Sequence, residues 1–193
     1  MSTDLAATEI PDFMTTLTDA VRKKRDRPSA SSVILALLQA ETTAKQQRIT
    51  YPLESLIGDW RLWFTAPRTH LQNGKALGKG LYVPQFAPAQ ISFSREDKLL
   101  ISNQIQLGSL RFKLTGSAKY FSKKNLLAFD FNRMQVCLFN RAIYDGKFRS
   151  KTMASSFNEQ PIAKLPFFAF FLVNEDFIAA RGRGGGIALW VRN

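Results

Sequence analysis

Cysteine and histidine are almost missing from this chain of 193 residues, which contains one of each, Cys137 and His70. A lone cysteine cannot form an intramolecular disulfide, so the sequence does not indicate an oxidising compartment. A lone histidine excludes a metal site built on several imidazoles, and a Cys–His pair would have to join two distant parts of the chain. A G-x-S-x-G motif is missing too, and no predicted strand face carries a carboxylate pair free of basic neighbours. We therefore predict that the protein is not an enzyme and has no catalytic residues and no bound metal.

Long hydrophobic runs are also missing. The longest, residues 165–173, has the length of a strand and is far shorter than the about 18 to 20 apolar residues of a membrane-spanning helix. Residues 1–13 contain acidic side chains and no arginine, which fits neither a secretory signal nor an organelle transit peptide. We expect a cytoplasmic protein of bacterial type, with a trimmed plant protein as the alternative.

Acidic residues are scarce, since 15 Asp and Glu stand against 27 Lys and Arg, and the formal net charge is +12. Such an excess of positive charge favours a polyanionic partner, either nucleic acid or an anionic lipid surface. A basic surface without any ligand is the alternative.

Apolar residues are abundant, at 45% of the chain with 16 Phe, and their spacing changes once. Before about residue 50 they recur at helical spacing, which predicts helices over residues 11–25 and from a cap at Ser31 or Ser32 to about Lys45. After Tyr51 they alternate, which predicts strands. The sequence thus predicts an N-terminal helical extension, residues 1–50, and a β domain, residues 51–193.

The β domain contains strand-length segments whose short separators carry turn residues, including Asn73 with Gly74 and Asp145 with Gly146. Short separators indicate sequential antiparallel pairing. So many consecutive strands would leave exposed edges unless the sheet closes, so we predict an antiparallel up-and-down β-barrel. The predicted strands are residues 59–65, 79–83, 89–95, 99–107, 110–121, 126–132, 135–144, 167–173, 177–181 and 187–192.

The alternation also predicts which side chains face the interior of this barrel. A small barrel either fills with side chains or holds one small ligand, and Gly116 leaves volume on the predicted inner face. Asn103 is polar and faces inward, so its amide needs a hydrogen-bond partner, which could be a ligand head group, buried backbone or water. The predicted cavity residues are Phe93, Ile101, Asn103, Phe112, Leu114, Gly116, Phe129 and Phe131.

The outer face of the predicted barrel carries two features. A basic stripe suited to an anionic membrane surface runs along the segment 110–121 and consists of Arg111, Lys113 and Lys119. In the first strand Trp60, Leu62 and Phe64 face inward, so Trp63 faces outward. A large aromatic side chain is unexpected on a solvent face, and we predict that the helix over residues 33–44 covers Trp63.

Both ends of the β domain resemble a known family. Residues 56–62, LIGDWRL, with Phe64 and Thr65, and the terminal segment NEDFIAARGRGGGIALWVR are similar to the plastid-lipid-associated proteins of plants and cyanobacteria, also called fibrillins or plastoglobulins. That family opens with L-x-G-x-W-x-L and an aromatic–Thr pair and has R-G-x-x-G before an apolar last strand. The matching positions here are Leu56, Gly58, Trp60, Leu62, Phe64, Thr65, Arg181, Gly182 and Gly185.

The resemblance implies a lipocalin-like barrel with two N-terminal helices. In lipocalins the tryptophan of G-x-W closes one end beneath an arginine from a late strand, and such stacking contributes about 0.5 to 2 kcal/mol. We therefore predict a barrel-closing group of Gly58, Trp60 and Arg181, with Arg192 as the alternative arginine.

The same resemblance implies a function. It implies non-catalytic binding of a hydrophobic or amphipathic small molecule, such as a carotenoid, quinone, prenyl lipid or fatty acid. Such a lipid, quinone or carotenoid would be the only bound cofactor. The resemblance also implies peripheral association with thylakoid membranes or plastoglobules, in a cyanobacterium or in a plastid.

Two other functions stay open on the residues alone. The net charge and the stretch RGRGGG, residues 181–186, favour a basic nucleic-acid-binding barrel, although most Phe residues lie on inner faces where bases cannot stack. Trp63 and the apolar segment from Phe167 to Phe171 favour a protein scaffold or assembly factor.

Overall fold

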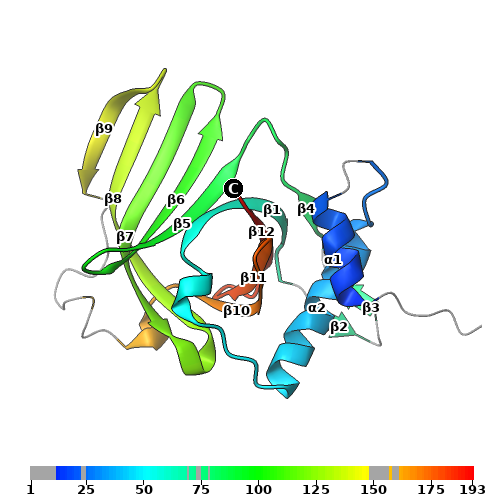
Figure 1. Cartoon of the computed structure of the whole chain (residues 1–193). Helices are drawn as coiled ribbons and strands as arrows, with labels where there is room; N and C mark the ends of the chain where they lie inside the picture. The colour runs from blue at the N-terminus through cyan, green and yellow to red at the C-terminus, as the bar shows by residue number, and fades with distance from the viewer. Residues whose placement is uncertain are drawn as a thin grey trace, which may run out of the picture.

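Two α-helices precede a large antiparallel sheet (Figure 1). The computed structural model describes residues 12–22, 25–68, 70–72, 75–77, 79–147, 157 and 161–193. Helix α1 is Phe13–Arg22 and helix α2 is Ala30–Gln46, where two helices were predicted. Ser29 caps α2, because its hydroxyl accepts a hydrogen bond from the backbone N–H of Ser32 at 3.1 Å. The predicted cap at Ser31 or Ser32 is wrong, since both residues lie in the first helical turn.

The strands form one ten-stranded sheet and one small hairpin, β2–β3. The order in the large sheet is β10-β11-β12-β1-β5-β6-β7-β8-β9, with β4 paired to β1. A further pairing of β10 with β8 closes the sheet into a ring of hydrogen bonds, so the predicted mainly β fold with two helices is confirmed. The strands are β1 (Gly58–Ala66), β2 (His70–Gln72), β3 (Lys75–Leu77), β4 (Leu81–Tyr82), β5 (Ala89–Arg95), β6 (Leu99–Leu107), β7 (Leu110–Phe121), β8 (Leu126–Leu138), β9 (Arg141–Lys147), β10 (Phe167–Val173), β11 (Phe177–Gly182) and β12 (Ile187–Arg192). Short 3₁₀ helices are η1 (Leu53–Ser55), η2 (Ser122–Lys124) and η3 (Ile162–Lys164).

Strand β8 is continuous, although the sequence predicts that one strand ends at residue 132 and a second begins at residue 135. Its register against β7 shifts between Thr115 and Gly116, which leaves Asn132 of β8 without a partner in the ladder. Such an extra residue is a β-bulge, which resets the alternation of side chains without ending the strand. The break in period near residue 132 therefore marks a bulge and not a turn.

The hairpin between β8 and β9 turns at Phe139 and Asn140, which have φ of 48° and 62°. The predicted turn at Asp145 and Gly146 is wrong, because both residues lie within β9, where Asp145 pairs with Gln135. Pairing with β8 outweighs the local turn preference of Asp-Gly. The other predicted turn, at Asn73 and Gly74, lies outside the described residues.

Strand β8 has different partners along its length, and this divides the sheet in two. Residues 126–128 pair with β10 and close the ring, whereas from Arg133 onward β8 pairs with β9. We call the ring around Trp60, Phe93 and Ile101 the closed half. We call residues 103–107, 110–114, 134–138 and 141–147 the open half, which extends beyond the ring at the upper left of Figure 1.

Two hydrophobic clusters lie on opposite sides of the closed half. The inner cluster fills the ring and contains Trp60, Phe93 and Trp190. The outer cluster joins α1 and α2, through residues such as Leu17 and Leu37, to the outer face of β1 and β10–β12. The division into residues 1–50 and 51–193 stays a prediction, although the helices share this cluster with the sheet.

Trp63 belongs to the outer cluster, as predicted. It is 7% exposed and lies in the same cluster as Val33 and Leu37 of α2, and its Nε1 donates a hydrogen bond to the carbonyl of Ala20 in α1 at 2.7 Å. The prediction that Phe64 faces inward is wrong. A register shift between Leu62 and Phe64 turns Trp63 and Phe64 toward the same helical layer.

Candidate functional site

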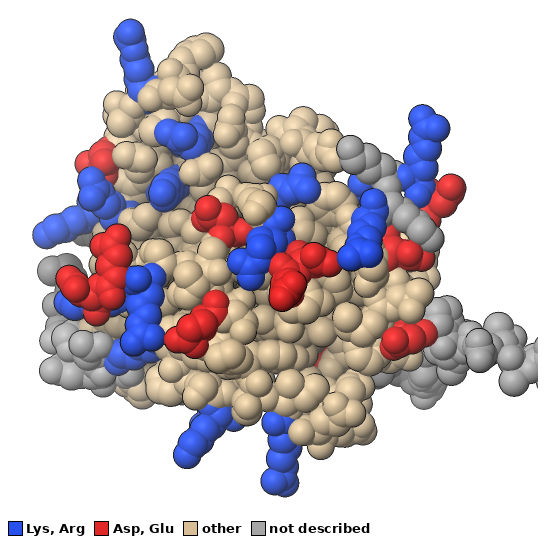
Figure 2. Space-filling view, in the orientation of Figure 1, with Lys and Arg blue, Asp and Glu red and all other residues tan. Residues whose placement is uncertain are grey.

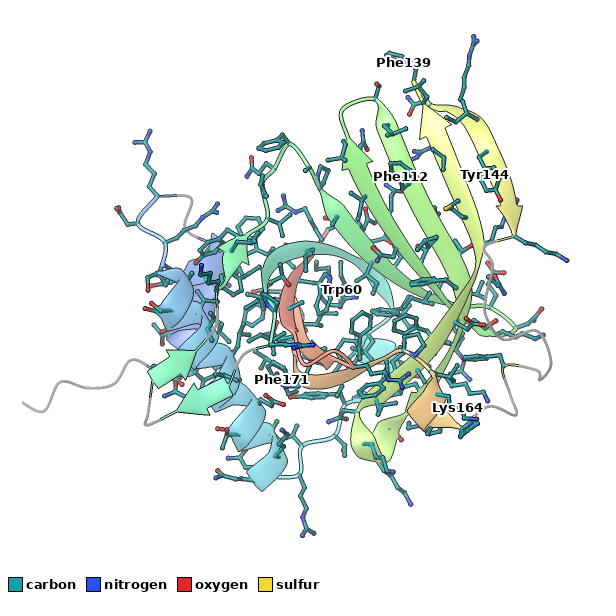
Figure 3. All side chains as sticks on the ribbon, turned by 180° about the vertical axis from the view of Figure 1, so that it is seen from behind. Trp60, Phe112, Phe139, Tyr144, Lys164 and Phe171 are labelled. Carbon is teal, nitrogen blue, oxygen red and sulfur yellow. The ribbon has the colours of Figure 1, made fainter. Side chains whose placement is uncertain are left out.

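Arg192 stacks on Trp60, which lies inside the ring (Figure 3). The guanidinium carbon of Arg192 is 4.0 Å from the centroid of the Trp60 ring. The two residues are direct partners in the pairing of β1 with β12, so their side chains share a face. Trp60 is fully buried, and its Nε1 donates a hydrogen bond to the carbonyl of Leu56 at 2.7 Å. The alternative arginine of the sequence analysis is thus the one that covers Trp60.

Gly58 supplies the room for this arginine. It has a φ of +130°, and a Cβ at this position would lie 2.8 Å from Nη1 of Arg192. The backbone conformation favours glycine, and the absence of a side chain also leaves room for the guanidinium. Arg192 also donates hydrogen bonds to the carbonyls of Glu175, at 2.8 Å, and Ile57, at 3.3 Å. The closing group consists of Gly58, Trp60 and Arg192.

Arg181 has another role, and the prediction that it stacks on Trp60 is wrong. It alternates with Ala180, which packs in the inner cluster, so its own side chain points to the helical layer. Its Nε lies 2.9 and 3.1 Å from the two carboxylate oxygens of Glu41 in α2, and its Nη1 donates to the carbonyl of Gly185 at 2.6 Å. Arg181 thus ties α2 to the sheet.

Glu41 is a buried carboxylate between two cations. Burial raises the pKa of its carboxyl group, but hydrogen bonds from Arg181 and from Lys45, at 2.8 Å, outweigh burial and hold the pKa below the ordinary value of 4.5. The group is therefore charged at neutral pH. A carboxylate held in this state anchors two elements and is a poor proton donor.

The closed half contains four predicted cavity residues, and there they form core: Phe93, Ile101, Phe129 and Phe131. Phe129 stacks on Phe168 with ring centroids 5.1 Å apart, and Phe93 meets Phe170 edge to face at 6.0 Å. Aromatic pairs at these separations are favourable beyond their burial. In this half protein side chains fill the interior, which is one of the two arrangements expected for a small ring.

The prediction that Gly116 leaves volume for a ligand is wrong. A Cβ at this position would lie 1.8 Å from the carbonyl oxygen of Asp130 on β8. Strands β7 and β8 approach this closely because the bulge at Asn132 lies beside Gly116. Glycine is needed for the backbone contact.

Phe112 and Leu114 lie in the open half, on the face that continues the interior of the ring. This inner face is apolar and only partly covered (Figure 3, labels Phe112 and Tyr144). Five of its side chains are between 38% and 51% exposed: Ile105, Leu107, Phe112, Leu138 and Tyr144. We call these five the apolar face. Its members lie on β6, β7, β8 and β9, so they form a contiguous patch across four strands.

Asn103 lies where the apolar face meets the closed half. It pairs with Ile91 on β5 and with Leu114 on β7, and it is half-buried. Its side-chain amide makes no hydrogen bond to any residue that the structure describes. A polar group in this position is available to a ligand that lies on the apolar face.

Strands β8 and β9 also contribute to this face, which was not predicted from the sequence. Val136 pairs with Phe112 and Tyr144, and Met134 pairs with Leu114, so they extend the same surface. The alternation of Met134, Val136 and Leu138 indicates this contribution, but the bulge at Asn132 interrupts the alternating pattern and resembles a strand end.

The predicted basic stripe lies on the other side of β7, opposite the apolar face. Two of its members have local partners. Arg111 donates to the sulfur of Cys137 at 3.5 Å, and Lys119 donates to the carbonyl of Phe157 at 3.3 Å with its ammonium 5.0 Å from the centre of that ring. Lys113 borders a shallow depression with Thr115.

The predicted protein-binding features are largely covered. Trp63 is buried beneath the helices, as described above. In the segment Phe167 to Phe171, Phe170 and Phe171 are buried in the two clusters, and the remaining residues are half-buried. Neither feature is exposed as an interaction surface.

Comparisons with known proteins do not assign the chain to a family. No family model matches it, and no similar sequence is found among curated proteins. Within the described part of the chain, neither helix is long and apolar enough to cross a membrane. The same residues contain no group of three or more His, Cys, Asp or Glu side chains that could hold a metal ion.

Proposed function

We propose that the protein binds a hydrophobic or amphipathic small molecule on the apolar face, without catalysis. The observation that carries this proposal is a contiguous set of partly exposed apolar side chains on one face of the open half, with the unbonded amide of Asn103 at its inner end. Ligand sites are mostly apolar with a few placed polar groups. A carotenoid, quinone, prenyl lipid or fatty acid has this division into an apolar body and a polar end.

The resemblance to the plastid-lipid-associated proteins supports the same proposal. The positions Gly58, Trp60 and Arg192 form one packed group here, as expected for a lipocalin-like barrel with its tryptophan beneath a late arginine. We accordingly propose membership of that family and a lipocalin-like barrel whose far half is open.

Peripheral association with an anionic membrane is a second part of the proposal. The tip of the open half carries Phe139, which is 76% exposed and lies at the β8–β9 turn (Figure 3). Ile143 and the cation Arg141 lie beside it on β9 and are exposed as well. An exposed apolar tip with a cation beside it suits the interface of an anionic bilayer, such as a thylakoid membrane.

The alternative of nucleic-acid binding has less support. Binding of single strands combines cations with aromatic side chains on one surface. Here Phe112 and Tyr144 lie on the inner face of the open half, whereas Arg111 and Lys113 alternate onto its outer face. For these four residues the two requirements are met on opposite sides of the sheet.

Mass spectrometry of small molecules bound to the purified protein tests the proposal directly. We expect a co-purified lipid, quinone or carotenoid in a denatured extract. A protein that is free of such molecules, and that takes up neither a fluorescent fatty acid nor a carotenoid when these are added, would refute the proposal.

A matched pair of substitutions locates the site. Ile105 and Leu100 lie on the same strand, β6, and are 43% and 42% exposed, but they face opposite sides of the sheet. Ile105→Lys should weaken binding of the fluorescent fatty acid by about tenfold or more, because it places a charge on the apolar face. Leu100→Lys should leave the affinity within about twofold. Equal losses in the two variants would place the ligand elsewhere.

A further inference from the structure

A second cleft, with basic walls and an apolar floor, lies at the end of α2 and far from the apolar face. It has a volume of about 280 Å³ and is bordered by the last turn of α2, the β7–β8 connection and β10. Its floor contains Ala44, Ile49 and Phe171. Four cations border it, and we call it the basic cleft: Lys45, Arg48, Lys123 and Lys124. Figure 2 shows basic side chains projecting from this lower edge of the molecule.

The charges of the basic cleft are not balanced. Among the described residues that line it, Glu41 is the one carboxylate, and it is already bonded to Arg181 and Lys45. Within the described chain, no acidic side chain lies within ion-pair distance of Arg48, Lys123 or Lys124. Like charges brought together from two distant segments repel one another, and a bound anion would relieve this repulsion.

Buried Asn125 holds the two basic segments together. Its Nδ2 donates to the carbonyl of Ile49 at 2.6 Å, its Oδ1 accepts from the N–H of Tyr51 at 2.9 Å, and its own carbonyl accepts from the N–H of Phe170 at 2.9 Å. Tyr120 adds a hydrogen bond from its hydroxyl to the carbonyl of Tyr51 at 2.8 Å. The backbone segments that carry the cations are therefore held in place without a ligand.

Arg48 occupies a backbone position that favours glycine. Helix α2 ends in a Schellman motif, in which the N–H of Ile49 bonds to the carbonyl of Ala44 at 3.0 Å and the N–H of Arg48 bonds to that of Lys45 at 3.4 Å. Arg48 is the left-handed residue of this motif, with φ of 51°. The left-handed conformation of Arg48 directs the chain from the end of α2 along the edge of the cleft, where this residue borders the cleft.

We infer that the basic cleft binds a phosphate group that is attached to a small apolar moiety. Three unbalanced cations suit the charge of a phosphomonoester, about −1.5 to −2, better than the single charge of a carboxylate. Arg48 offers the planar fork that binds phosphate through two hydrogen bonds, and the lysines add point charges. The volume accommodates a head group and the first carbons attached to it but not a whole acyl chain.

Calorimetric titration of the whole chain with dihexanoyl phosphatidic acid tests this inference. The triple variant Arg48→Gln, Lys123→Gln, Lys124→Gln should bind about tenfold or more weakly than the unchanged protein. The control Arg25→Gln, Lys79→Gln, Lys98→Gln removes the same residue types at exposed positions elsewhere and should stay within about twofold. No binding by the unchanged protein, or an equal loss in the control, would overturn the inference.

Binding of inorganic phosphate shows whether the apolar part of the ligand contributes to affinity. Inorganic phosphate should bind more weakly than the lipid if the apolar floor contributes, and equal affinity would identify the ligand as a free phosphate group bound at the same cations.

Arg48→Gly should raise the melting temperature by about 2 to 4 °C while it weakens phosphate binding, because it removes strain and charge together. An Arg48→Gly variant that binds phosphatidic acid as well as the unchanged protein would contradict the role of this arginine. Ile105→Lys should leave this binding intact, so the two sites fail or succeed independently.

Discussion

The closed and open halves of the sheet share strands β6, β7 and β8, whose inner faces are buried in the closed half and partly exposed in the open half. In the closed half Phe93 and Phe129 are buried beneath β10 and β11. In the open half Ile105 and Phe112 carry on the same inward pattern but remain partly exposed. The difference comes from β8, which pairs with β10 at its start and with β9 at its end. An apolar alternating pattern therefore identifies a face and does not say whether another layer covers it.

The largest expected effect separates the two halves directly. Phe93→Ala should lower the free energy of unfolding by about 3 to 5 kcal/mol, because Phe93 is 1% exposed and its removal leaves a cavity. Phe112→Ala should cost about 1 kcal/mol or less, because its side chain is already partly in water. Urea unfolding of both variants measures the contrast. Similar losses would mean that the open half is covered in solution.

A smaller effect tests the junction of the halves. Gly116→Ala should cost about 3 kcal/mol, since its Cβ would overlap the backbone carbonyl of Asp130, which cannot move without breaking the β7–β8 pairing. Gly184→Ala is the control, because nothing lies within 4 Å of a Cβ there. A Gly116→Ala variant as stable as the control would show that the strands can separate at the bulge.

The stability of the contact between the helices and the closed half should depend on pH, because Glu41 contributes to it as a carboxylate. The pKa of this carboxyl is depressed in the folded protein, so its stabilisation is fully present above 4.5 and is lost as the pH falls through the lower folded-state value. Glu41→Gln should lower the free energy of unfolding by about 2 kcal/mol at pH 7. It should also make the free energy of unfolding less dependent on pH in the acid range. Glu54→Gln, in an exposed ion pair with Arg95, should leave the profile unchanged. Identical acid limbs for Glu41→Gln and the unchanged protein would contradict this account.

The smallest effect concerns the arginine at Trp60. Arg192→Ala should cost about 1 kcal/mol and change the fluorescence of Trp60, because it removes the guanidinium 4.0 Å from the indole ring. Arg95→Ala, at an exposed position, is the comparison for stability. A spectrum and a stability that match those of the Arg95→Ala variant would count against the stacking.

Local sequence patterns determined much of the fold. The spacing of apolar residues predicted both helices and most strands, because each period follows from backbone geometry alone. The same pattern showed that Trp63 faces away from Trp60, and the demand of a large indole for cover predicted the helical layer over it. Phe112, Leu114 and Asn103 were assigned to the inner face for the same reason.

Tertiary structure decided what local patterns could not. The bulge at Asn132 and the shift beside Trp63 depend on the partner strand, and each moves every later side chain to the other face. The choice between Arg181 and Arg192 depends on the register of β1 against β12, which places Arg192 directly opposite Trp60. Closure of one half and exposure of the other depend on β10, which follows β8 by many residues and pairs only with its first residues. These are contacts between segments far apart in the chain, so the composition and period of one segment alone could not reveal them.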